Sequence, residues 1–513
     1  MSATIEPRLS EGRLSHVERT RGGAGPATGG PSTSGGPATG GARTGGAAST
    51  TGEQAPIIEQ PFVIEHREAL IYMLALAAEL EHSITCQYLF ATFTMKQNAD
   101  EGLTAEQLDA VKRWRRTIGK VAEQEMLHLA LVQNLLVSLG AAPHLSRPNF
   151  PHPARHFPQA VQLQLMPFGE EAMRHFVYLE RPEGMAMEDA AQFAGLPVDA
   201  SPPGLVDPEI VPQVQDFQTV GHLYRAIEEG FLQLAERFGG ERLFIGPPSA
   251  QATAEHFRWP ELVRVHDLAS ARAAIDTIVE QGEGARGDWR EAHFGRFVEV
   301  LDELRALTAA DPSFQPSRLV IPACIRPVEG GLVMPMISDP FTIRVADLMN
   351  VGYEILLQIL SRYFAHTDET ETQLATLADV SVGLMFDAVR PLGNVITTLP
   401  LGPDHFGWTA GPNFELFYAA DYLLPHRGPA WRIIEERLRE AAAFGERVQA
   451  EAAASDDPDA VATVEPIGKV VAAYHGYAER IAAGAAESTA VAESTAVAES
   501  TAVAESTGAI ESS

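Results

Sequence analysis

The hydrophobic pattern of the chain is clearest between residues 118 and 139, which read IGKVAEQEMLHLALVQNLLVSL. Steps of three and four residues along this stretch give a row that lies on one face of a helix. That row consists of Ile118, Val121, Glu125, His128, Val132, Leu135 and Leu139. The pattern predicts an amphipathic helix with Glu125 and His128 one turn apart on its buried face. Burying two ionisable groups is unfavourable unless something compensates their charge.

A second amphipathic helix is predicted from Ile64 to Phe93. Its buried row alternates steps of four and three and consists of Leu70, Leu74, Ala77, Glu81, Ile84 and Tyr88. Glu81 therefore occupies a position that an apolar residue would normally fill. A single inward Glu is more often a hydrogen-bonded buried carboxylate than a metal ligand, so Glu81 alone leaves both interpretations open.

The two helices together indicate a metal site. In two-metal carboxylate bundles of the ferritin-like type, one helix contributes a Glu and another contributes Glu-x-x-His. Glu81 on the first helix, with Glu125 and His128 on the second, matches half of this arrangement. The alternative is a solvated pair on an exposed face, because so short a motif is frequent by chance. The inward position of both residues favours the metal site.

Two further helices are predicted downstream, and each has a candidate ligand. Residues 214–238 carry a buried row bordered by Glu228. Residues 268–280 begin a fourth helix, which is interrupted by the glycine-rich sequence GEGARGD and resumes near Trp289. Glu283 falls in step with the row before the interruption, and His293 begins the row after it.

Composition narrows the functional classes. The formal net charge is -30 and the isoelectric point is about 4.9, which argues against nucleic acid and an anionic membrane surface as partners. We see no apolar run that predicts a membrane span and no signal peptide, so we expect a cytoplasmic protein. Two cysteines, Cys86 and Cys324, cannot form a disulfide framework or a thiolate zinc site.

Several segments, taken in order, resemble a known family. They are AELEHSIT, the run from EQEMLHLAL to LQLMPF, FVYLERPE, TVGHLYRAIEEGF, TIVEQGEG and AHFGRF. They are similar to the ferritin-like domain of iminophenyl-pyruvate dimer synthase and its relatives, enzymes of bisindole pigment biosynthesis. The similarity covers residues 60–310 and extends toward residue 440 through ADLMNVGYEILLQIL and TAGPNFEL.

The resemblance implies that the third and fourth helices also supply ligands. It places His222 where relatives would carry a Glu, which would leave a two-metal centre more positive. It places Glu283 and His293 at the ligand positions of the fourth helix, with Glu280 as the substitute carboxylate. The expected metal set is therefore Glu81, Glu125, His128, His222, Glu228, Glu283 and His293.

The predicted fold is all-α: a ferritin-like four-helix bundle with a proline-rich excursion at residues 143–167 and additional C-terminal helices. We expect a disordered segment at residues 1–55, the bundle at 56–310, packed helices at 311–450 and a flexible tail with AESTAV repeats at 451–513.

The predicted metal site and the family resemblance together imply two alternative classes of function, and the substrate class given for the first is what the resemblance implies. The first is a diiron or dimetal oxidoreductase that uses dioxygen or peroxide on a small organic substrate, derived from an aromatic amino acid, in secondary metabolism. It would hold two iron ions per chain, with manganese as another fit and haem as a weaker alternative. The second is a non-catalytic metal-binding or metal-free structural module. Either form could be a homo-oligomer.

Overall fold

The computed structural model describes residues 64–152, 157, 161, 163–183, 185, 187, 217–284, 289–327, 334–417, 423 and 425–486. These residues are mainly helical, so the expected all-α fold is confirmed. The expected disordered segment at residues 1–55 and the AESTAV repeats lie outside the described residues.

Two long helices form one half of a four-helix bundle, α1 (Arg67–Thr94) and α2 (Ala105–Ser138). They pack against each other along most of their length. Thr104 starts α2 with a capping box, in which its hydroxyl accepts from the N–H of Gln107 and the Gln107 side chain accepts in return.

The other half of the bundle consists of four shorter helices in two pairs. They are α3 (Glu170–Leu179), α4 (Val220–Phe238), α7 (Leu268–Gly282) and α8 (His293–Ala310). Helix α3 packs against α8, and α4 packs against α7. The third and fourth helices of the bundle are thus each built from two pieces. The sequence predicted this interruption in the fourth helix but not in the third.

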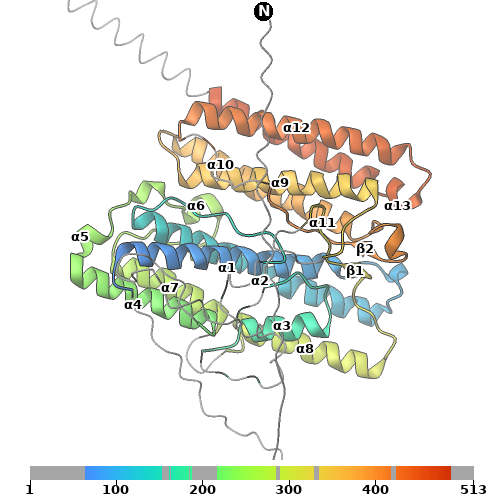
Figure 1. Cartoon of the computed structure of the whole chain (residues 1–513), viewed down its shortest axis with the longest axis horizontal. Helices are drawn as coiled ribbons and strands as arrows, with labels where there is room; N and C mark the ends of the chain where they lie inside the picture. Colours follow the sequence, from blue (N-terminus) through green and yellow to red (C-terminus); the bar gives the residue numbers. More distant parts are fainter. Residues whose placement is uncertain are drawn as a thin grey trace, which may run out of the picture. The chain divides into compact units, whose positions relative to one another are not determined.

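A second helical layer covers the other side of α1 and α2 (Figure 1). It contains α9 (Pro340–Phe364), α10 (Glu371–Leu384), a π-helical turn (Met385–Val389) and α11 (Arg390–Ile396). Helix α12 (Arg427–Ala453) packs on α9 from outside. The long pair α1–α2 is therefore the middle layer of the molecule.

Short elements connect these helices. They are η1 (Ala99–Glu101), α5 (Gly240–Leu243), η3 (Pro248–Ala250), α6 (Ala254–Phe257), η6 (Pro403–His405) and α13 (Pro458–Val461). Strands β1 (Val320–Ile321) and β2 (Thr409–Ala410) pair in parallel, with Val320 opposite Thr409.

The expected flexible tail does not begin at residue 451. Residues 464–486 form a further helix, and Ile467, Tyr474 and Ile481 on it are fully buried. These residues recur at steps of seven, which keeps them on one helical face against the second layer. This periodicity was present in the sequence ahead of the AESTAV repeats and predicts a packed helix.

The described residues of the proline-rich excursion, 143–152, 157, 161 and 163–167, contain no helix or strand. Gln133 of α2 fixes its start, donating to the carbonyl of His144 and accepting from its N–H, both at 2.7 Å. Arg147 is buried and donates to the carbonyl of Phe414 at 2.6 Å.

Helix α1 is long and apolar enough to span a membrane by length and composition, although we saw no such run in the sequence. In the structure 72% of its apolar window is buried, and Glu81 and His82 lie among its buried residues. These features are typical of the core helix of a bundle.

Candidate metal centre

The interruptions in the third and fourth bundle helices occur at the same level, beside the middle of α1 and α2. Helix α3 ends at Glu180, and α8 begins at His293. Helix α7 ends at Glu283. Glu180, Glu283 and His293 therefore lie at helix ends. Glu81 and Glu125, in contrast, lie within the continuous helices α1 and α2.

Five buried side chains near these helix ends make two overlapping groups with the spacing of metal ligands. One group is Glu81, Glu125 and His128, and the other is Glu125, Glu180 and His293. Within each group one potential ligand atom per residue lies within 4.8 Å of the others. All five residues are buried. Glu125 belongs to both groups.

Glu125 turns one carboxylate oxygen toward each imidazole. Its Oε2 lies 2.7 Å from Nδ1 of His128, and its Oε1 lies 2.9 Å from Nδ1 of His293. The Glu81 carboxylate lies 3.6 Å from Nδ1 of His128, and Glu180 lies 3.6 Å from Nδ1 of His293. Each half of the centre thus offers a terminal carboxylate, an imidazole and one oxygen of the shared carboxylate.

The residues present fit a bound metal pair. Nδ1 of His293 already faces Glu125 Oε1 at 2.9 Å, but its Nε2 is buried and makes no hydrogen bond to the described residues. Such groups are rare unless an ion or water completes them. Glu81, Glu125, His128 and Glu180 line a cavity of about 20 Å³, which admits small ions or water but no organic molecule. Oxygen and nitrogen ligands without thiolate suit iron or manganese.

Burial and mutual charge shift the pKa values of this cluster. Burial raises the pKa of Glu81 to about 7, which the nearby Glu125 charge favours and His128 opposes. For His128, burial acts to lower the pKa, but the charge of Glu125 outweighs it and raises the value to about 10. For Glu125, burial acts to raise the pKa, but the charges of His293 and His128 lower it. Without a metal, the cluster therefore keeps protons on its imidazoles.

The terminal carboxylates are oriented by two buried tyrosines. The hydroxyl of Tyr224 on α4 donates to Glu81 Oε1 at 2.5 Å, and the hydroxyl of Tyr88 on α1 donates to Glu180. Gln281 lies 3.2 Å from Nε2 of His128, on the side of the ring facing away from Glu125. Such partners fix the direction of a ligand and raise its affinity for metal.

Glu283 lines the cavity but belongs to neither tight group. Its carboxylate accepts from the backbone N–H of Glu183 at 3.3 Å and lies 3.7 Å from Arg225. Burial raises its pKa to about 7. A Cβ atom on Gly221 would lie 1.6 Å from Glu283 Oε1, so only glycine leaves room for this carboxylate at the start of α4.

Three other expected ligands lie elsewhere. His222 is buried in the first turn of α4, where its backbone N–H donates to Thr219, and it is in neither group. Glu228 pairs with Arg272 at 2.7 Å. The substitute carboxylate, Glu280, is exposed. The structure brings none of these three into the cluster.

Glu180 was missed in the sequence. Met173, Phe176 and Glu180 follow the same steps of three and four that identified Glu81. Met173 and Phe176 are fully buried. An inward row that ends in a carboxylate was therefore the available signal.

Comparisons with known proteins identify the type of domain in which the cluster lies. Residues 74–302 match the sequence model of a family described as ferritin-like, and this span contains every residue of the cluster. The chain thus carries a ferritin-like domain, and the resemblance seen in the sequence is confirmed.

Two curated relatives are each 28% identical to this chain. Dichlorochromopyrrolate synthase of Lentzea aerocolonigenes aligns over 412 residues, 74% of this chain and 39% of its own length. The 2-imino-3-(indol-3-yl)propanoate dimerase of Chromobacterium violaceum aligns over 395 residues, 70% of this chain and 35% of its own length. The chain thus matches little more than a third of the length of these relatives. A solved ferritin-like protein from Caulobacter vibrioides is 21% identical, with a TM-score of 0.36, covering 61% of this chain and 92% of that one.

Proposed function

We propose that the chain is a ferritin-like dimetal oxidoreductase that binds two iron ions and acts on a small organic substrate derived from an aromatic amino acid. The observation that carries this proposal is the sharing of Glu125 between two buried carboxylate and imidazole groups. The name of one relative supports the substrate class, since it describes a dimerase of 2-imino-3-(indol-3-yl)propanoate, an imine with an aromatic indole group.

The five buried carboxylate and imidazole side chains would hold the two ions. Glu125 would bridge the two ions, with Glu81 and His128 completing one side and Glu180 and His293 the other. When bound, two iron ions would supply redox chemistry toward dioxygen or peroxide. Manganese fits the same ligands.

The surrounding side chains hold and orient the ligands. The hydroxyls of Tyr224 and Tyr88 keep the carboxylates of Glu81 and Glu180 directed at the centre. The protons held by His128 and Glu81 would leave when cations bind, because metal ligands must be deprotonated. Complete burial of the cluster excludes bulk water and strengthens each of these interactions.

Two alternatives find less support. A cavity of about 20 Å³ has no room for haem. A metal-free structural module would leave the buried Nε2 of His293 without a hydrogen-bond partner among the described residues, at a cost of roughly 1–3 kcal/mol. A cytoplasmic location remains part of the proposal.

The test is substrate-dependent oxygen consumption by the iron-loaded chain, with imines of aromatic 2-oxo acids as the substrates. The wild-type chain should consume oxygen, and Glu125→Ala should not. Glu228→Gln is the matched control, because it removes a carboxylate that pairs with Arg272 on the surface. Equal oxygen consumption by wild type and Glu125→Ala would contradict the proposal.

A further inference from the structure

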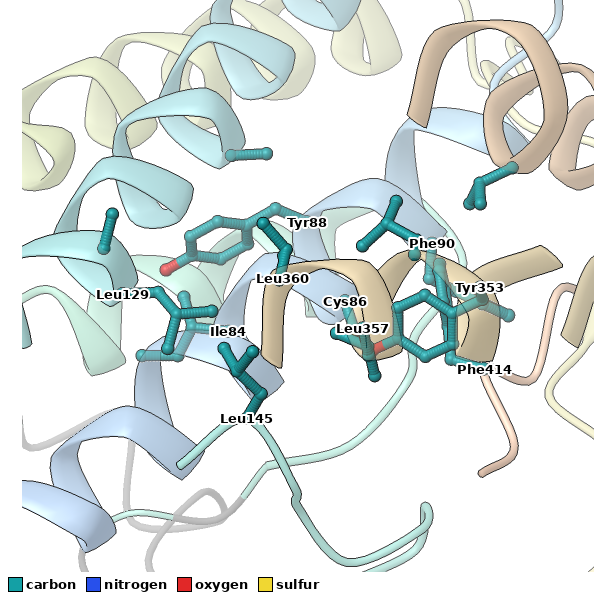
Figure 2. Close-up of a cluster of buried hydrophobic side chains, with 14 of the residues drawn as sticks. Ile84, Cys86, Tyr88, Phe90, Leu129, Leu145, Tyr353, Leu357, Leu360 and Phe414 are labelled. Carbon is teal, nitrogen blue, oxygen red and sulfur yellow. The ribbon is translucent and has the colours of Figure 1, made fainter. Parts of the chain in front are cut away.

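A large cavity lies on the other side of α1 and α2 from the metal centre. Its volume is about 700 Å³, within the range of small-molecule sites. Figure 2 shows part of its wall, where Tyr353, Leu357 and Leu360 of α9 lie close to Leu129 of α2 and Cys86 of α1. It shares no lining residue with the cavity at the metal centre.

Aromatic rings form much of the lining. They include Phe93 on α1, Phe257 at the end of α6, and Phe386 in the π-helical turn. Phe386 is 56% exposed, which is unusual for a large apolar side chain beside a core. Single π-helical turns often occur at functional sites. These features favour an occupant with a flat apolar body.

A glycine in the middle of α2 enlarges the cavity. Gly119 lines it, and a Cβ atom built there would meet no other atom within 4 Å. Glycine in a helix interior is less stable than alanine by about 1 kcal/mol. No neighbouring side chain requires this glycine, so the space beside it is available to a ligand.

One end of the cavity carries cations without carboxylate partners. Lys112, Arg115 and Arg116 of α2 and Arg390 of α11 line it, and no ion pair joins them to a described carboxylate. Burial and the neighbouring charge of Arg390 lower the pKa of Arg115 to about 10. Such crowding is notable in a chain with a net charge of -30.

The other two cations in the lining are already neutralised. Lys120 lies 3.2 Å from Glu123, and Arg258 lies 3.4 Å from Asp379. The positive charge available to a ligand is thus concentrated where α2 meets α11.

We propose that this cavity binds a small aromatic carboxylate. The ring system would lie among the aromatic side chains and beside Gly119, and the carboxylate would face Lys112, Arg116 and Arg390. Arginine and lysine are the usual partners of carboxylates, and aromatic faces supply the apolar contact. This binding is independent of the proposed function, since it requires no metal.

Two dyes of matched shape test the charge preference on metal-free protein. The dye 1-anilinonaphthalene-8-sulfonate is an aromatic anion, and N-phenyl-1-naphthylamine has the same rings without the charge. Fluorescence titration should give an affinity for the anionic dye that is about tenfold higher or more, the gain expected from charged contacts of roughly 1.4 kcal/mol. Equal affinities would overturn the assignment of an anion.

Substitutions of lining residues test whether the dyes bind in this cavity. Gly119→Leu should weaken both dyes at least tenfold without lowering the melting temperature, because leucine favours a helix more than glycine does. Lys112→Gln combined with Arg116→Gln should weaken only the anionic dye. Arg113→Gln should change neither affinity, because Arg113 lies on the same helix but contacts Glu303 of α8. Unchanged affinities in the first two variants would overturn the proposal.

Competition between the anionic dye and other carboxylates identifies the chemical class of ligand that the cavity prefers. Naphthoate should displace the anionic dye, whereas decanoate, a carboxylate with a flexible chain, should displace it at least tenfold less well. Preference for decanoate would replace the aromatic ligand with a fatty acid and contradict the proposal. Purification of the protein with haem in this cavity, visible from its Soret absorption and blocked by Gly119→Leu, would also contradict it.

Discussion

The candidate metal centre and the larger cavity border the same two helices, α1 and α2, and differ in volume, polarity and charge. The first packs carboxylates and imidazoles around about 20 Å³, and the second surrounds about 700 Å³ with apolar side chains. In the first, charges compensate one another within a few ångströms. In the second, four cations lack ion-pair partners among the described residues.

Helix α2 therefore borders two regions of different chemistry on two of its faces. Helix α2 presents Glu125 and His128 on one face and Lys112, Arg116 and Gly119 on another. The two regions border the same helices but share no lining residue. Experiments that change one region and leave the other intact are therefore the most informative.

Glu125→Ala should have the largest effect. Loss of the shared carboxylate removes a ligand from both halves of the centre, so bound iron should fall from about two ions per chain to nearly none. Elemental analysis after anaerobic loading with Fe²⁺ measures this. Dye binding in the larger cavity should not change. Retention of one ion would show that the two groups bind independently.

The ligand affinities of the two regions should also depend differently on pH. His128 has its pKa raised to about 10 without metal, so protons compete with metal and the affinity rises with pH from 5 to 8, by up to about tenfold per pH unit for each proton displaced. The anionic dye should bind equally over this range, because Arg115 keeps its charge even with a pKa lowered to about 10. Parallel titrations of both ligands at pH 5, 6, 7 and 8 test this contrast.

The raised pKa of His128 also makes the stability of the metal-free protein depend on pH. The raised pKa of His128 means that its contribution to folding is complete below about pH 6.5, the value in the unfolded chain, and is lost as the pH rises toward 10. The metal-free protein should therefore melt at a lower temperature at pH 9 than at pH 6.5. His128→Gln should reduce this difference, and an identical difference in the variant would assign it to other groups.

Tyr224→Phe should have a smaller effect, confined to the metal centre. It removes the hydroxyl that donates to Glu81 while keeping the ring in the core. Metal affinity should fall by roughly 10- to 100-fold, as for other residues that orient ligands. Tyr474→Phe is the control, since its hydroxyl donates to the carbonyl of Leu348 in the second layer. An equal loss in both variants would indicate a general effect on folding.

Two glycines should respond oppositely to alanine. Gly221→Ala forces the Glu283 carboxylate to move and should destabilise the protein by roughly 1–3 kcal/mol. Gly119→Ala meets only open space and should stabilise it by roughly 0.5–1 kcal/mol. Urea unfolding of the metal-free variants measures both. A stabilising Gly221→Ala would show that Glu283 lies elsewhere in solution.

Sequence patterns predicted the parts of the site that lie on long helices. Glu81, Glu125 and His128 were found because an inward polar residue breaks an otherwise apolar row, and the structure places all three together. His293 was suggested by its row and by resemblance, and it joins them. Here local periodicity alone determines which way a side chain points.

The remaining parts depend on tertiary packing. Glu180 ends a ten-residue helix, and only the pairing of α3 with α8 brings it to Glu125. His222 was expected from the resemblance and Glu228 because it borders the inward row of residues 214–238, but the packing of α4 brings neither into the cluster. The larger cavity was not foreseen, since its walls come from helices more than 200 residues apart in the chain.

The central claim is that Glu125 joins two metal ions in one buried centre. Its most direct test is an anaerobic titration of the wild-type chain with Fe²⁺, followed by electron paramagnetic resonance after partial oxidation. The account predicts binding that saturates at two ions per chain and a spectrum of two magnetically coupled ions. Saturation at one ion, or two ions with independent spectra, would contradict it.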